Sequence, residues 1–155
     1  MAQRGGVVTC SVCIGDLQSP LVGDAEADII FGFEPVETYR ALPKANPGTR
    51  VVTSTSPVVP VGVSIGLEKY PDINALFAEI RKITAKLTCV DSDLLARNAG
   101  SYVTANSVLL GALAGTDDCP LKRESIIEAL KGSVPPKTVE MNLKAFELGF
   151  NESGD

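Results

Sequence analysis

The sequence predicts an α/β domain in which helices cover both faces of a mostly parallel sheet. Two observations predict this fold class. Short segments rich in β-branched and aromatic residues alternate with amphipathic helical segments along the 155 residues, as in successive βαβ units. Three or four helical segments also gather toward the C-terminal end, which is enough to cover one face of a sheet.

The strand and helix within residues 25–42 organise the rest of the chain. The strand, 27–33, is a short and largely apolar run, which is typical of a strand covered on both faces. Gly32 permits a tight turn, and Pro35 suits the first position of a helix, where a missing N–H costs nothing. We therefore expect this turn at the carboxyl edge of the sheet, where open α/β folds commonly meet ligands and partners.

The other elements follow in order along the chain. A β-branched run predicts a strand at 50–55, and Asp72 and Asp91 are expected to cap the helices that follow them. A nearly all-apolar stretch at 102–114 predicts a buried helix. The remaining predicted elements are strands at 7–14 and 86–90, an extended connection at 58–67, and helices at 73–83, 94–98, 120–131 and 137–149.

Composition narrows the class of function. The net charge is -5 and no basic block is present, which argues against binding to nucleic acid or to anionic membrane surfaces. The chain contains no histidine, which removes His-based triads, His metal ligands and the usual general base near neutral pH. No apolar run is long enough to span a membrane and no secretory segment is visible, so we expect a cytoplasmic protein. Residues 1–150 are expected to form one domain, and 151–155 a disordered polar tail.

Four cysteines raise the question of a redox or metal site. Cys10 and Cys13 form a C-x-x-C, a spacing that such sites use. In a strand at 7–14, however, residues three apart point to opposite faces. Cys89 and Cys119 also do not supply the second pair that a zinc or iron–sulfur site needs. Buried structural thiols are therefore favoured over a metal or redox site.

Several polar residues are candidates for contact at the carboxyl edge. The hydroxyls of Ser54 and Ser56 lie at the end of the strand predicted at 50–55, where they either face solvent in a turn or contact a ligand or partner. Asn106 interrupts the apolar helix, so its amide must find a partner, either at the end of a neighbouring strand, which is favoured, or on a ligand. No phosphate-binding loop, nucleophile elbow or carboxylate pair is present. These patterns by themselves predict a fold and no chemistry.

Five blocks of sequence, taken together, resemble one family over essentially the whole chain. They are similar to the β subunit of indolepyruvate:ferredoxin oxidoreductase. More broadly, they resemble the γ domain of the 2-oxoacid:ferredoxin oxidoreductases that act on pyruvate, ketoisovalerate and 2-oxoglutarate. The blocks are MAQRGG at 1–6, ADIIFGFEPVETYRALP at 27–43, PVGVSIGLEKYPD at 60–72, NSVLLGALAG at 106–115 and VPPKTVEMNLKAFELGF at 134–150.

The resemblance implies a Rossmann-like three-layer sandwich that works as a non-catalytic subunit. The complete enzyme would decarboxylate an aryl pyruvate oxidatively with coenzyme A, giving an aryl-acetyl-CoA, CO2 and reduced ferredoxin. Thiamine diphosphate, magnesium and the iron–sulfur clusters would belong to a large catalytic α subunit, with ferredoxin a more indirect partner. This chain would hold none of these cofactors, since it lacks the cysteine sets for clusters and an evident diphosphate–magnesium motif.

The resemblance also implies a departure at the N-terminus. Family members begin earlier, with a strand, a glycine-rich turn and a helix, so we expect a first β–α unit of on the order of 30 residues to be missing. Its absence would expose a strand edge, and we therefore expect self-association through that edge.

Matched residue by residue, the resemblance also gives a set of site residues. The segment Gln3, Arg4, Gly5 and Gly6 has two interpretations on its own, a flexible chain end or a backbone close to another molecule. The resemblance favours contact with coenzyme A or a partner subunit, and Arg4 would pair with a carboxylate or a phosphate. None of these residues is expected to be a nucleophile, a base or a metal ligand. The other residues expected to line the same edge are Glu34, Ser54, Ser56 and Asn106.

Two alternatives stay open at this point. The chain is either a γ subunit for another 2-oxoacid, namely pyruvate, ketoisovalerate or 2-oxoglutarate, or a free-standing α/β module that binds coenzyme A or a nucleotide.

Overall fold

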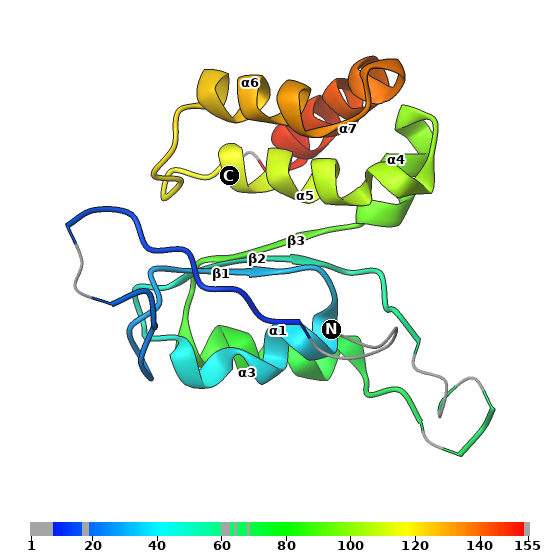
Figure 1. The fold of residues 1–155 in the computed structure, drawn as a ribbon. Coiled ribbons are helices and arrows are strands. Elements are labelled where there is room, and N and C mark those ends of the chain that lie inside the picture. The colour runs from blue at the N-terminus through cyan, green and yellow to red at the C-terminus, as the bar shows by residue number, and fades with distance from the viewer. Residues whose placement is uncertain (1–7, 17–18, 60–62, 64, 68, 154–155) are drawn as a thin grey trace.

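The computed structural model describes residues 8–16, 19–59, 63, 65–67 and 69–153. In this part of the chain, three parallel strands form a sheet in the order β1-β2-β3, with Phe31 opposite Val52 and Val52 opposite Thr88. Figure 1 shows α1 and α3 on one face of the sheet and α4 to α7 on the other, so the predicted arrangement of helices on both faces is confirmed. The strands are β1 (Ile29–Gly32), β2 (Arg50–Ser54) and β3 (Leu87–Val90). The helices are α1 (Pro35–Arg40), α3 (Ile73–Ile83), α4 (Ser92–Ala99), α5 (Ala105–Ala114), α6 (Arg123–Ser133) and α7 (Val139–Glu152), with short 3-10 turns η1 (Leu42–Lys44), η2 (Tyr102–Thr104) and η3 (Pro136–Thr138).

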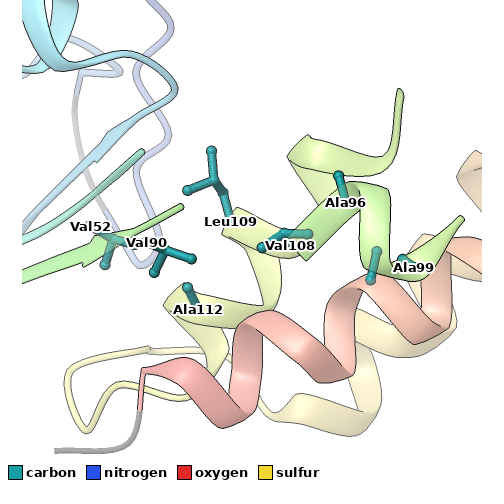
Figure 2. Packing of buried hydrophobic residues seen from close by; sticks show 8 residues of the cluster. Val52, Val90, Ala96, Ala99, Val108, Leu109 and Ala112 are labelled. Carbon is teal, nitrogen blue, oxygen red and sulfur yellow. The ribbon is translucent and has the colours of Figure 1, made fainter. Parts of the chain in front are cut away.

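Neighbouring residues of β2 supply the cores on the two faces of the sheet. Side chains alternate along a strand, so Val51 points toward α1 and α3, whereas Val52 points toward α5. Val51 packs with Phe77 and Ile80 of α3. On the opposite face, Val52 and Val90 meet α5, and the small residues of α4 allow that helix to pack behind it (Figure 2). The fully buried β2 is therefore the centre of the fold.

The contact between α5 and α7 depends on two glycines. A Cβ on Gly111 would lie 1.9 Å from the carbonyl oxygen of Phe146, and one on Gly149 would lie 1.8 Å from that of Val108. Each glycine therefore permits the backbone of the other helix to approach closely.

Aspartates cap the starts of α3 and α4, as the sequence predicted, and a glycine ends α4. Asp72 accepts a hydrogen bond from the backbone N–H of Asn74 at 2.9 Å, and Asp91 accepts one from Leu94 at 2.9 Å. These bonds cap α3 and α4, because they satisfy N–H groups that the first helical turn leaves without partners. After α4, Gly100 takes φ +131°, which ends the helix.

The strand predicted at 7–14 is wrong for its described residues. Residues 8–14 form neither strand nor helix, and the side chains of Val8 and Val12 are 74% and 77% exposed. An apolar run becomes a strand only where a neighbouring strand satisfies its backbone groups, and none of the three described strands pairs with this segment. The apolar pattern was therefore not sufficient evidence for a strand.

The C-terminal tail also begins later than predicted. Helix α7 continues through Glu152, and Ser153 is buried, with its hydroxyl donating to the carbonyl of Phe150 at 2.9 Å. A Cβ on Gly115 would lie 2.0 Å from that hydroxyl oxygen, so the end of α7 packs against the end of α5. No helix in the described part of the chain is long and apolar enough to cross a membrane.

Candidate functional site

The carboxyl edge of the sheet is built around Glu34, which follows β1. Its backbone is extended and one carboxylate oxygen accepts the N–H of Glu37 at 2.9 Å, which caps α1. The other carboxylate oxygen accepts a hydrogen bond from the hydroxyl of Tyr70. The buried Glu34 side chain therefore anchors the segment that precedes α3 to this edge.

A second buried contact joins α1 to the centre of the sheet. The hydroxyl oxygens of Thr38 and Thr53 lie 2.7 Å apart, and Thr38 also donates to the carbonyl of Glu34 at 2.7 Å. A Cβ on Gly32 would lie 1.8 Å from the Thr38 hydroxyl oxygen, so this contact requires glycine at the end of β1. The hydrogen bond between the Thr38 and Thr53 hydroxyls thus holds the predicted turn after β1 in place.

The hydroxyls of Ser54 and Ser56 connect β2 to the start of α4. Ser54 is fully buried, and its hydroxyl oxygen lies 2.7 Å from that of Ser92. Ser54 also accepts the N–H of Ser56 at 2.9 Å, and Ser56 donates to a carboxylate oxygen of Asp91 at 3.0 Å. Both serines therefore lie at the predicted edge. Their hydroxyls form hydrogen bonds within the chain, so neither simply faces solvent, which was one of the two interpretations.

This arrangement holds loops in place and shows no catalytic set. Glu34 and Asp91 already accept hydrogen bonds from helix N-termini, and the buried hydroxyls are paired with one another. None of these contacts pairs a hydroxyl with a group that takes its proton near neutral pH. The sequence analysis did not identify the partners of these candidates, which are Thr38, Tyr70 and Ser92. The one available signal was the i, i+4 spacing of Glu34 and Thr38, which places them one helical turn apart.

Exposed apolar residues follow each of the three strands, close in the chain to this polar network. We define the apolar rim as the exposed residues that follow the three strands: Phe33 after β1, Val58 and Val59 after β2, and Leu94 in the first turn of α4. Phe33 and Leu94 are 48% and 54% exposed, and the ring of Phe33 packs edge-on against Phe31 with their centroids 4.8 Å apart. Exposed apolar side chains gathered at one edge are typical of a protein–protein contact surface.

Asn106 differs from the favoured of its two interpretations. It is exposed on α5, so it is not a buried amide that pairs with the end of a neighbouring strand, and its contact with a ligand or partner stays a prediction. The buried amide of this helix pair is Asn142 on α7, which accepts a hydrogen bond from the Ser107 hydroxyl at 2.7 Å and donates to the carbonyl of Thr138 at 2.9 Å. An apolar helix pattern does not show which of two adjacent polar residues faces inward. The other predicted site residues, Gln3, Arg4, Gly5 and Gly6, lie outside the described residues.

A shallow groove lies away from this edge, between α1 with η1 and α3. It holds about 490 Å³ above an apolar floor that includes Leu42 and Ile83. Its charged side chains are already in ion pairs, Arg40 with Glu37 at 2.5 Å and Lys82 with Glu79 at 2.6 Å. The groove therefore offers no unpaired charge from either pair to hold an ionic ligand.

The cysteines correct another prediction. Cys10 is exposed and Cys13 partly exposed, so they are not buried structural thiols, because the strand that would have buried one of them is absent. Cys89 is half-buried on β3, where burial raises the pKa of its thiol and nearby Arg81 partly opposes that shift. Among the described residues, no group of three or more His, Cys, Asp or Glu side chains could hold a metal ion.

Comparison with known proteins now identifies the family. Residues 1–152 match the family model described as pyruvate ferredoxin/flavodoxin oxidoreductase. The chain belongs to this family. A relative from Archaeoglobus fulgidus, named indolepyruvate oxidoreductase subunit IorB, is 36% identical over 99% of this chain and 76% of its own length. A relative of the same name from Thermococcus kodakarensis is 42% identical over 96% of this chain and 75% of its own length.

A solved structure has a similar architecture. The γ subunit of a keto/oxoacid ferredoxin oxidoreductase from Geobacter sulfurreducens superposes with a TM-score of 0.58 at 19% identity. The match covers 81% of this chain and 63% of that one, so this chain spans less than two thirds of the solved subunit. At this identity the likeness shows the fold alone, and it agrees with the predicted α/β class.

Proposed function

We propose that this chain is the non-catalytic subunit of an indolepyruvate:ferredoxin oxidoreductase. In that complex it supports the coenzyme A-dependent oxidative decarboxylation of aryl pyruvates to aryl-acetyl-CoA, CO2 and reduced ferredoxin. One observation carries the proposal: four relatives named indolepyruvate oxidoreductase subunit IorB are 32–42% identical to it over 96–100% of the chain. A cytoplasmic location stays a prediction from the sequence.

The described residues support a division of labour in the proposed complex. They offer no cluster that could hold iron or magnesium, and the hydroxyls and carboxylates at the carboxyl edge are used in internal hydrogen bonds. We propose that thiamine diphosphate, magnesium and the iron–sulfur clusters are bound elsewhere in the complex. We assign them to a large catalytic α subunit, which would also be the subunit that passes electrons to ferredoxin.

We propose that the described part of the edge does not anchor coenzyme A. Glu34 and Asp91 bring negative charge to this edge, which disfavours a phosphate, and the Ser54 hydroxyl is already paired with Ser92. A contact with coenzyme A would then depend on Gln3, Arg4, Gly5 and Gly6, and this stays a prediction. We treat coenzyme A as a co-substrate of the complex.

The apolar rim is our candidate for the surface that meets the catalytic subunit. Glu34 and Asp91 accept hydrogen bonds beside Phe33 and at the N–H of Leu94, so the backbone that carries these two rim residues is held before the partner arrives. A preformed surface loses less conformational entropy on binding than a mobile one.

Co-purification tests the proposal. The chain is co-expressed with its candidate large subunit, and Leu94→Ser on the rim is compared with Leu121→Ser. Leu121 is a matched control, because its side chain is 49% exposed, close to the 54% of Leu94, but it precedes α6 instead of following a strand. We expect the wild type and Leu121→Ser to retain the large subunit, and Leu94→Ser to lose on the order of tenfold in affinity, as for one apolar contact residue.

The outcomes separate the proposal from its alternatives. Binding that Leu94→Ser leaves unchanged would remove the rim from the interface but keep the subunit assignment. Failure of the folded wild type to bind would favour a free-standing module. With a reconstituted complex, coenzyme A-dependent reduction of ferredoxin is measured with indolepyruvate, pyruvate, ketoisovalerate and 2-oxoglutarate. Preference for any of the last three would assign the chain to another branch of the family.

A further inference from the structure

Cys10 and Cys13 form a feature that the proposed assembly role does not use. We propose that this pair is a thiol–disulfide exchange site, which closes into an intramolecular disulfide by reaction with a small-molecule disulfide. The proposal concerns this chain's own chemistry and does not depend on the catalytic subunit.

Exposure is the first observation that supports the exchange site. Cys10 is exposed and Cys13 partly exposed, and both are free thiols. A disulfide reagent can therefore reach Cys10 without any unfolding of the domain. Val12 between them is 77% exposed, so a rearrangement of this segment uncovers no buried side chain there.

The backbone around the two cysteines can bring them together. Residues three apart in a strand are separated by roughly 10 Å, whereas the two Cα atoms of a disulfide lie within about 7 Å. Described residues 8–14 form neither strand nor helix, and no backbone hydrogen bond joins them to another described segment. A bend between Cys10 and Cys13 therefore breaks no ladder or helix bond, unlike in the strand that the sequence predicted.

The other two cysteines are less suited to exchange. The attacking species is the thiolate, and burial raises the pKa of the Cys89 thiol, which packs with the core beneath α3. Cys119 packs against the cluster formed by α6 and α7, and its sulfur lies 3.6 Å from the carbonyl oxygen of Leu121. Neither has a second cysteine three residues away.

The reaction balances with a small-molecule disulfide as oxidant. The Cys10 thiol loses its proton, and the thiolate attacks one sulfur of the reagent, which forms a mixed disulfide and expels one thiolate. The Cys13 thiol then loses its proton and attacks the Cys10 sulfur, which expels the second thiolate. The two released protons protonate the two leaving groups, so the protein gives up two electrons and the reagent becomes two thiols.

Peptide mass mapping in glutathione buffers tests the exchange. The full chain is equilibrated at different ratios of oxidised to reduced glutathione, quenched with acid and alkylated. We expect the peptide that contains Cys10 and Cys13 to lose two hydrogens in a fraction that follows the buffer ratio, while Cys89 and Cys119 stay alkylated. Glutathione adducts that persist on wild-type Cys10, or a disulfide that forms only in urea, would overturn the proposal.

Variants separate the roles of the two thiols. In Cys13→Ser no thiol can resolve the mixed disulfide, so we expect one stable glutathione adduct at Cys10. Cys119→Ser is the matched control and should form the internal disulfide as the wild type does. Thermal unfolding of both variants checks that the fold is kept, and Cys13→Ala replaces Cys13→Ser if the latter is destabilised. Equal adduct formation in wild type and Cys13→Ser would show that the pair does not act together.

Discussion

At the scale of single residues, Gly111 sets the distance between α5 and α7. We predict that Gly111→Ala lowers the free energy of unfolding by about 1–3 kcal/mol, because its Cβ would overlap the Phe146 carbonyl oxygen and force the helices apart. Gly132→Ala in α6 is the matched control, since no atom lies within 4 Å of its Cβ position. There, alanine's helix propensity should raise stability by up to about 1 kcal/mol. Urea unfolding of both variants measures the difference, and equal effects would contradict the close approach.

Single residues were also the scale at which prediction from sequence reached its limit. The positions of Glu34, Ser54 and Ser56 at the carboxyl edge followed from the strand ends, because parallel strands all finish on the same side of a sheet. Their partners did not follow, since the pairing of Ser54 with Ser92 joins residues 38 positions apart in the chain. The burial expected of Asn106 was wrong for a local reason: a helix that is apolar almost all round does not reveal which polar residue faces its neighbour.

At the scale of elements, Asp118 ties the loop between α5 and α6 to the starts of β2 and β3. Its carboxylate accepts hydrogen bonds from Lys86 at 2.7 Å and from the buried Arg50 at 2.7 Å. These two partners, Lys86 first, lower the pKa of Asp118 from its ordinary value of 3.8. Because the folded pKa is the lower one, the stabilisation is complete above the unfolded pKa and is lost as pH falls through the folded pKa.

We therefore predict a pH-dependent effect for Asp118→Asn. The wild type should exceed this variant in free energy of unfolding by the same amount from neutral pH down to about 5, and the difference should shrink as pH falls below about 4. Denaturant titrations across this range measure it. Asp117→Asn, which removes the same charge from the exposed neighbouring residue, is the control. A difference that grows on acidification, or an equal one in the control, would contradict the role of Asp118.

Elements were predictable where two kinds of local signal agreed. Strands β1, β2 and β3 and helices α3, α4 and α5 combine an apolar pattern with a cap, a proline or a glycine at their boundaries. The segment 7–14 carried the apolar pattern alone, and strand formation also requires a neighbour, which no local pattern specifies. The same limit explains why Cys10 and Cys13 were expected to be held on opposite faces of a strand.

At the scale of the whole molecule, β1 and β3 are the outer strands of the described sheet. Among the described residues, β1 and β3 each pair only with β2, and Ile29 and Phe31 of β1 are partly exposed. A free edge offers unpaired N–H and C=O groups to another chain. The side chains of β1 are largely aliphatic or aromatic, whereas β3 carries Thr88 and Cys89, so β1 presents the more apolar of the two edges.

We predict that the isolated chain self-associates through β1. Sedimentation velocity should show a dimer fraction that rises with protein concentration. Ile29→Lys should abolish it, because a lysine on the edge strand opposes pairing with a second copy, whereas Thr88→Lys on β3 should not. Circular dichroism confirms that each variant keeps its fold. A monodisperse monomer at every concentration, or equal loss of dimer in both variants, would contradict association through β1. Addition of the large subunit then tests whether the same edge is used in the enzyme. If the large subunit binds only the monomer, the catalytic subunit lies over β1. If it binds the dimer, the apolar rim is a separate contact.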